Sequence, residues 1–434
     1  MWGIIEPGIS RSPLRAARGS CGTCRRPSAS LLALAGAILM TLTPARAQDV
    51  PTFTVLHSFG QGQNDGVAPD GGLTLAGPND FYGVTTSGGR FGDGTVYKVE
   101  ISGQETVLYE FGGMDGDAPV GNLVRDSAGN LYGTTALGGD HYLGNVFKLD
   151  SQGTLTVLYS FTGSPDGASP WAGLVRDQAG NLYGTTVGGG GGSCTSLQAA
   201  PGCGTVFKLD VTGHETILHT FTGAPDGAQP FAPLMAGSDG NLYGVTSYGG
   251  DGKCPPQQYL PAGCGTVFKL TRSGEYTVLY SFAGRPDGND PSAGLVQDSA
   301  GNLYGTTYAG GTGYCNNEIN CGTVFKVDPS GKETVLYSFA GINTPDGIGP
   351  QGNLIIGPHG ILYGTTYVGG AFKYGTIFCL TPAGKETVLY TFNGISGGWP
   401  RDGLLRDKHG NLYGTAYLGG TMGFDKGVVF RLSP

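Results

Sequence analysis

The sequence predicts an all-β protein, a seven-bladed β-propeller with four antiparallel strands in each blade. One observation is that a stretch close to GNLYGTT occurs seven times in 434 residues. Another is that glycine supplies 82 residues without the G-X-Y period of collagen, as expected where many short strands are joined by tight turns. Repeated units of roughly 50 residues with four strands each are typical of propeller blades. The tyrosines that mark the repeat are Tyr82, Tyr132, Tyr183, Tyr243, Tyr304, Tyr363 and Tyr413.

Residues 1–47 differ in character from the repeats. Several arginines precede a short apolar run at 31–42, and the small-residue sequence ARA follows at 45–47. This order is typical of a signal peptide cleaved after Ala47. An uncleaved anchor is the alternative, but the apolar run is short for a bilayer. We therefore expect an exported mature chain, 48–434, that is one propeller domain without a transmembrane segment.

Each unit contains four short runs rich in Val, Leu, Thr, Tyr and Phe, bounded by Gly, Asp or Asn, as strands usually are. In the third unit the runs are 173–177, 181–186, 204–209 and 216–221. Gly180 and Gly213 fall in the hairpin turns between runs and are expected to adopt the left-handed conformation. No segment of the mature chain shows an apolar period of 3.6 residues over a useful length, so helices are not expected.

The two ends of the repeat region predict how the ring closes. The run at 53–59 is a fourth strand without its first three, and the run at 427–432 is a third strand without its fourth. Pairing these two runs completes one blade and removes two open sheet edges. An open solenoid would instead need polar capping repeats, and the sequence contains none.

The unit DxxGNLYGTT…GTVFKL…TVLYSF, which covers 53–434, resembles the GloVer-type tandem repeats of secreted bacterial proteins. It is similar, more loosely, to the propeller repeats of two-component sensor ectodomains. The resemblance implies export and a propeller-like fold. It implies no particular reaction.

A D-G-x-x-P motif lies on the connection from each fourth strand to the next first strand. Six carboxylates around a channel mouth could hold a cation or bind sugar hydroxyls. The alternative, which we favour, is that each aspartate caps the amides of its own turn, since a feature shared by six units is explained by folding. The aspartates are Asp65, Asp115, Asp166, Asp226, Asp287 and Asp346, and the seventh unit has Ser396.

The connections between second and third strands carry insertions in three adjacent units, each with two cysteines. In an exported chain such pairs predict local disulfides, each stabilising its loop by about 2–3 kcal/mol. Zinc is the alternative, but the spacing is wide and further ligands are missing. The predicted pairs are Cys194–Cys203, Cys254–Cys264 and Cys315–Cys321, which leaves Cys379 as a shielded thiol.

Other residues give weaker indications. A lysine near the end of the third strand and a glutamate at the start of the fourth, such as Lys98 and Glu105, predict cross-strand ion pairs. The sequence contains no G-x-S-x-G, H-E-x-x-H or Walker-type motif. We therefore predict no catalytic residue, metal or cofactor. The aromatic residues that could stack on sugar rings from the insertion-bearing face are Trp171, Tyr259, Tyr314 and Trp399.

The net charge of −8 argues against nucleic acid as a partner. The leading hypothesis is a secreted or periplasmic, non-catalytic and monomeric binding scaffold that recognises a glycan or a protein through the stapled loops on one face. One alternative is a propeller-type polysaccharide lyase or glycoside hydrolase using carboxylates of raised pKa. Another is a structural module of the cell envelope.

Overall fold

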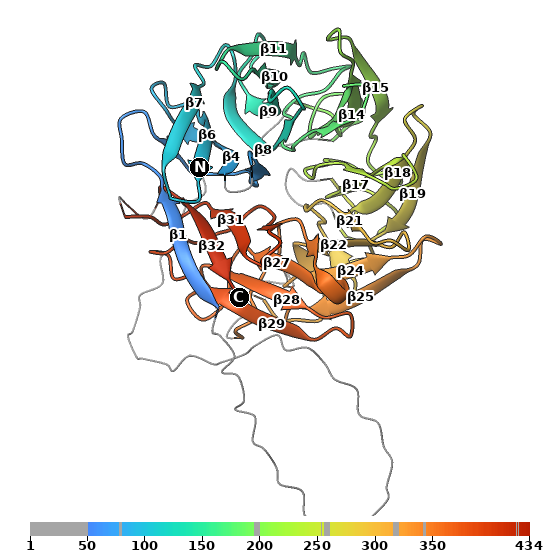
Figure 1. Cartoon of the computed structure of the whole chain (residues 1–434). Helices are drawn as coiled ribbons and strands as arrows, with labels where there is room; N and C mark the ends of the chain where they lie inside the picture. Colours follow the sequence, from blue (N-terminus) through green and yellow to red (C-terminus); the bar gives the residue numbers. More distant parts are fainter. Residues whose placement is uncertain are drawn as a thin grey trace, which may run out of the picture.

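Seven four-stranded antiparallel sheets surround a common axis in the computed structural model (Figure 1). This architecture confirms the predicted seven-bladed propeller. The structure describes residues 51–77, 80–194, 200–252, 254–255, 261–315, 321–341, 344–421, 423 and 425–434. The predicted signal peptide lies outside these residues. Within them, no helix has the length and apolar character needed to cross a bilayer.

The blades are numbered along the chain, and their strands are given from the axis outward. Blade 1 contains β3 Thr74–Leu75, β4 Asp80–Thr85, β6 Thr95–Glu100 and β7 Glu105–Glu110. Blade 2 contains β8 Asp117–Arg125, β9 Leu131–Leu137, β10 Asn145–Leu149 and β11 Leu155–Ser160. Blade 3 contains β12 Val175–Arg176, β13 Leu182–Thr186, β14 Thr205–Leu209 and β15 Glu215–Thr220.

The remaining blades repeat this order. Blade 4 contains β16 Met235–Ala236, β17 Leu242–Thr246, β18 Thr266–Leu270 and β19 Tyr276–Ser281. Blade 5 contains β21 Val296–Gln297, β22 Leu303–Thr307, β24 Thr323–Val327 and β25 Glu333–Ser338. Blade 6 contains β26 Ile355–Ile356, β27 Leu362–Thr366, β28 Thr376–Leu380 and β29 Glu386–Thr391. Blade 7 contains β30 Leu405–Arg406, β31 Leu412–Ala416, β32 Val428–Ser433 and β1 Thr52–Ser58. A single 3-10 turn, η2 Pro358–Gly360, is the one helical element of the described residues.

Most innermost strands are shorter than predicted. The run expected at 173–177 pairs only over Val175–Arg176. In β8 the register with β9 breaks between Val120 and Val124, and the Gly121 amide at this break donates to the carbonyl of Asp70 in the neighbouring blade at 3.2 Å. A Cβ on Gly121, whose φ is +67°, would lie 2.2 Å from the Gly173 nitrogen. Adjacent inner strands therefore approach so closely at the axis that only glycine fits there.

Hydrogen bonds explain why the GNLYGTT stretch is repeated. In blade 2 the Asp126 carboxylate accepts from the Asn130 backbone amide at 2.9 Å, the Asn130 side-chain amide at 2.8 Å and the Tyr132 hydroxyl at 3.1 Å. A Cβ on Gly133 would lie 2.6 Å from the buried ring of Phe147. The repeat thus encodes one ring-sized gap in every blade and the same hairpin cap in blades 2, 3, 5 and 7.

Ring closure occurs as predicted. Strand β1 lies antiparallel to β32, from the pair Thr52–Ser433 to the pair Ser58–Val428 (Figure 1). Phe53 of β1 stacks on Tyr390 of blade 6 with ring centroids 3.9 Å apart. The N-terminal strand therefore completes blade 7 and also packs against its neighbour.

The hydrophobic core lies between the sheets. One cluster joins Val146 and Phe161 of blade 2 to Leu174, Leu182 and Phe207 of blade 3, all buried. Comparable clusters lie between the other blades. The core is therefore a ring of apolar layers, and burial of these layers is the main force holding blade to blade.

Candidate functional site

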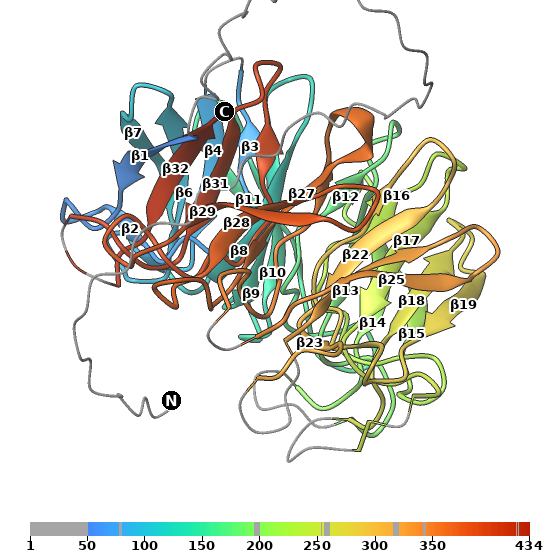
Figure 2. The ribbon, with the colours of Figure 1, turned by 90° about the horizontal axis from the view of Figure 1, so that it is seen from below.

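Two sets of connections meet on one face of the ring, which we call the loop face. They are the connections from the fourth strand to the next first strand and those from the second strand to the third. Strand β2 Gly66–Val67 of the first kind pairs with β5 Ser87–Gly88 of the second, and β20 Gly288–Asn289 pairs likewise with β23 Ala309–Gly310. Seen edge-on, β2 and β23 lie on the same side of the ring (Figure 2).

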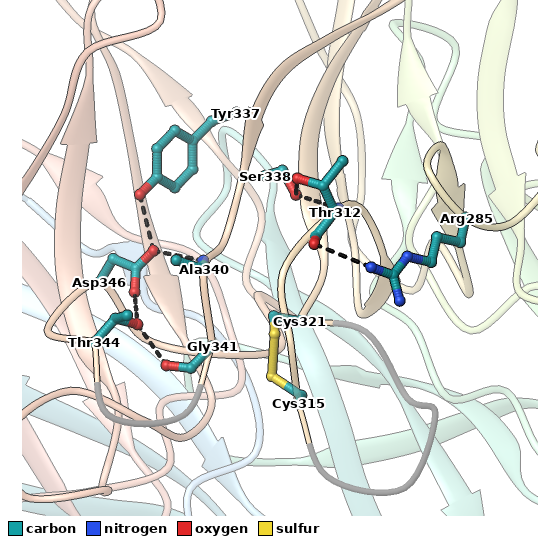
Figure 3. The surroundings of a disulfide bond; sticks show 10 residues. All are labelled: Arg285, Thr312, Cys315, Cys321, Tyr337, Ser338, Ala340, Gly341, Thr344 and Asp346. Atoms are coloured by element: carbon teal, nitrogen blue, oxygen red, sulfur yellow. Dashed lines mark hydrogen bonds between the residues drawn. A yellow bond between two sulfur atoms is a disulfide. The ribbon is translucent and has the colours of Figure 1, made fainter.

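The three predicted disulfides are present on the loop face, as Cys194–Cys203, Cys254–Cys264 and Cys315–Cys321. In blade 5 the Cys315–Cys321 bond lies next to the loop that ends at Asp346 (Figure 3). That carboxylate accepts from the Tyr337 hydroxyl and the Ala340 amide, both at 2.8 Å. Cys379 is buried and lies outside the three disulfides.

The six aspartates of the D-G-x-x-P motif have the predicted capping role. Asp166 accepts from the Thr162 amide at 3.0 Å, and the Tyr159 hydroxyl of the outer strand donates to it at 2.7 Å. Equivalent backbone bonds reach Asp65, Asp115, Asp226, Asp287 and Asp346. These carboxylates lie beside the outer strands because each is at the start of a connection that runs inward. The arrangement around the channel mouth, which the sequence left open as the other possibility, is therefore not the one observed.

The predicted lysine–glutamate ion pairs are not among those of the described residues. Lys98 instead pairs with Asp80 at 2.9 Å. The first residue of an outer strand points toward the aspartate of the preceding blade, and four such residues are glutamates. Burial first, and then a nearby aspartate, raises the pKa of each to about 7. They are Glu105, Glu215, Glu333 and Glu386.

The prolines of the motif also have a structural role. Each packs against the glycine that precedes the third strand of the preceding blade: a Cβ on Gly144 would lie 2.7 Å from Pro170. All seven units contain both residues, and a leucine always follows the proline by four positions. Proline, glycine and leucine are thus accounted for by packing.

The residue directly after each proline is different in all seven blades. It begins the innermost stretch of its blade on the loop face, so we call these seven residues the axial ring. A position that varies between invariant neighbours is not required by the repeated fold. The axial ring comprises Asp70, Val120, Trp171, Phe231, Ser292, Gln351 and Arg401.

Aromatic and charged groups gather where blades 6, 7 and 1 meet. An Arg401 guanidinium nitrogen lies 2.7 Å from an Asp70 carboxylate oxygen, and the two side chains are 31% and 18% exposed. The guanidinium also lies 3.9 Å from the ring centroid of Tyr417. Tyr367 lies 5.4 Å from the ring of Trp399. Burial opposes the charge of Arg401, but Asp70 and Tyr367 outweigh burial and raise its pKa. We call these five residues the axial cluster.

A second group lies farther round the same face, in blades 4 and 5. Burial raises the pKa of Asp290 to about 6, although the Ser247 hydroxyl opposes the shift. Burial and then the charge of Asp290 raise the pKa of Tyr248. The Tyr308 amide donates to the carbonyl of Asp290 at 2.8 Å. A half-buried carboxyl group with tyrosines nearby is thus available on the loop face.

The predicted aromatic residues have different positions. Trp399 belongs to the axial cluster, and Trp171 is in the axial ring with its buried indole Nε1 unpaired among the described residues. Tyr314, 78% exposed, precedes the third disulfide. Tyr259 lies outside the described residues. Sequence reasoning missed Asp70, Tyr367, Arg401 and Tyr417, which an alignment of the seven units on their prolines would have found.

These features define a class of protein: a disulfide-bearing seven-bladed propeller with chemically diverse residues at the axis of one face. The chain belongs to the Gloeobacter/Verrucomicrobia repeat family, whose model matches residues 35–255 and 256–434. This membership confirms the family expected from the repeated unit.

Solved structures support the fold. The virginiamycin B lyase from Staphylococcus aureus superposes with a TM-score of 0.54 at 14% identity, over 88% of this chain and 99% of that chain. The extracellular domain of a candidate hybrid two-component system from B. thetaiotaomicron superposes with a TM-score of 0.50 at 14% identity, over 88% of this chain and 41% of that chain. No curated protein matches the chain. Similarity at this level of identity establishes the propeller, which supports both enzymes and binding domains.

Proposed function

We propose that the protein is an exported, non-catalytic binding scaffold that recognises a neutral glycan through the axial cluster of its loop face. The observation that carries this proposal is the diversity of the axial ring between invariant proline and leucine. Folding accounts for the repeated residues, so the residues that differ are the ones free to serve recognition. Three disulfides on the same face suit the oxidising compartment that export implies.

The chemistry of the axial cluster favours a sugar. Trp399, Tyr367 and Tyr417 are half-buried, so each offers part of a rigid aromatic surface at little cost in conformational entropy. Arg401 and Asp70 supply planar donors and acceptors that match hydroxyl groups. Because their charges offset each other, the cluster favours an uncharged ligand over a polyanion.

Glycan-array binding of the mature chain, followed by calorimetry with the best oligosaccharide, tests this proposal. Trp399→Ala should weaken binding at least tenfold and leave the melting temperature nearly unchanged. Val211→Ala is the control: Val211 is 71% exposed in a hairpin on the opposite face, and its loss should not alter affinity. A Trp399→Ala protein that binds at full strength would exclude the axial cluster. Capture of a protein partner without any glycan binding would exclude the glycan.

A lyase is the second candidate, because Asp290 is a carboxyl group of raised pKa on the loop face. Proton abstraction needs a base that titrates near the working pH, whereas hydrolysis of a glycosidic bond ordinarily needs two carboxyl groups. Asp290→Asn should then abolish release of unsaturated sugars from a polysaccharide substrate. Unchanged release in this variant would remove Asp290 as the base.

A further inference from the structure

Three side-chain positions meet at every seam between neighbouring blades, outside the axial cluster. They are an aromatic residue near the end of one outer strand, the residue at the aspartate position of the following loop, and the first residue of the next blade's outer strand. At three seams the set is Tyr, Asp and Glu, and the tyrosine hydroxyl donates directly to the aspartate. These bonds are Tyr159–Asp166 at 2.7 Å, Tyr280–Asp287 at 2.9 Å and Tyr337–Asp346 at 2.8 Å.

The seam between blades 7 and 1 is different. Its three residues are His57 of β1, Asp65 of the following loop and Glu105 of β7. The His57 Nε2 lies 4.0 Å from the Asp65 Oδ1, too far for a hydrogen bond. One atom from each of the three side chains lies within 4.8 Å of the other two.

All three groups have unpaired atoms at this point. The His57 Nε2, the Asp65 Oδ1 and the Glu105 Oε1 are buried, with no hydrogen-bond partner among the described residues. The Asp65 side chain is only 7% exposed and that of His57 only 13%. Leaving such groups unpaired is costly. The three residues are among those that line a groove of about 990 Å³.

The other histidine seam lacks this arrangement. His219 lies 3.2 Å from Asp226, within hydrogen-bond distance. Tyr276 takes the place of the glutamate and stacks on the imidazole, with ring centroids 3.8 Å apart. Of the seven seams, all within the described residues, only that between blades 7 and 1 combines an imidazole with two carboxylates.

We propose that His57, Asp65 and Glu105 bind one divalent transition-metal ion, of which zinc is the best-matched example. One imidazole and two carboxylates suit zinc better than calcium, which prefers oxygen ligands only. Zinc–ligand bonds near 2.1 Å place two ligand atoms roughly 3–3.5 Å apart. The 4.0 Å gap between His57 and Asp65 closes to that value by a side-chain movement of under about 1 Å.

The ion would connect blade 7, which the N-terminal strand completes, to blade 1. His57 lies on the strand that completes blade 7, and Glu105 lies on the outer strand of blade 1. A ligand that binds only the folded ring stabilises it in proportion to its saturation. Zinc should therefore raise the melting temperature as well as bind.

The test uses the mature chain after treatment with a chelator. Calorimetric titration with zinc should show one site, and the melting temperature should rise with zinc concentration. Cobalt should give visible absorption bands of a site with nitrogen and oxygen ligands. His57→Tyr converts the seam to the Tyr, Asp and Glu set of three other blades, so it should fold and yet bind zinc at least tenfold more weakly. Glu105→Leu copies the seam that contains Leu155 and should behave likewise.

His219→Tyr is the matched control, because it removes a histidine from a seam that lacks the third ligand. It should keep the affinity and the melting response of the unmodified protein. Absence of a zinc site in the unmodified protein would overturn the proposal. So would retention of tight zinc binding by both His57→Tyr and Glu105→Leu, which would locate the ion at another histidine.

Discussion

The free energy of unfolding should fall as pH rises toward neutral, and replacing three glutamates at the seams between blades by glutamine should prevent this fall. Glu215, Glu333 and Glu386 each have a buried carboxylate oxygen without a hydrogen-bond partner among the described residues. Burial and a neighbouring aspartate raise the pKa of each from 4.5 to about 7. The folded protein therefore holds protons that the unfolded chain releases between about pH 4.5 and 7. The free energy of unfolding must fall as pH rises through this window.

The magnitude follows from the size of the shift. A pKa raised from 4.5 to about 7 changes the free energy of unfolding by at most about 3 kcal/mol for each glutamate. These side chains are half-buried, and solvent screening reduces the effect to about 1 kcal/mol each. The three seams are well separated, so their effects should add to about 3 kcal/mol.

Urea unfolding at pH 4, 5, 6, 7 and 8 measures this effect. The triple variant E215Q/E333Q/E386Q should match the unmodified protein at pH 4, below the unfolded pKa, and exceed its free energy of unfolding by about 3 kcal/mol at pH 8. Glu275→Gln is the control, because Glu275 is exposed and precedes β19; its curve should follow that of the unmodified protein. Parallel pH curves for the triple variant and the unmodified protein would refute the reasoning.

Three further predictions concern the scaffold. Deleting residues 48–60 removes β1 and exposes two sheet edges, so the melting temperature should fall by well over 10 °C in a calorimetric scan; a fall of only a few degrees would contradict the closure. Cys379 is fully buried in β28, so it should react with iodoacetamide only under denaturing conditions. Mass spectrometry detects the label, and labelling of the native protein would show that β28 opens. Replacing both Cys315 and Cys321 by serine should lower the free energy of unfolding by about 2 kcal/mol in urea titrations, whereas an unchanged midpoint would mean that the disulfide does not constrain the unfolded chain.

The repeat made most of the fold predictable. Strand number, hairpin glycines such as Gly180, ring closure and the disulfides all follow from patterns within one unit or from the leftover strands at its ends. The short inner strands did not, because their ends are set by contacts between blades. A single unit contains no information about those contacts.

The candidate sites were less predictable for the same reason. Sequence reasoning favoured a capping role for the aspartates but left a ring at the channel mouth open, because it located their connection without deciding which end of it they occupy. It recognised Trp399 as an exposed aromatic residue but had no means of bringing Arg401 and Asp70 together across 331 residues. His57 and Glu105 come from different blades, and only the seam geometry makes them neighbours.

The pairing of β1 with β32 has a consequence for how the chain folds as it is synthesised. Thr52 and Ser433 pair although they are 381 residues apart, whereas strands within blades 1 to 6 pair over a few tens of residues. Each of those blades can form as soon as its own segment has emerged from the ribosome. Strand β1 emerges before its partner and stays unpaired until β32 follows. The incomplete chain is therefore an open arc with two exposed sheet edges, and aggregation is a risk throughout that interval. A truncation just before residue 428 would prolong this state indefinitely.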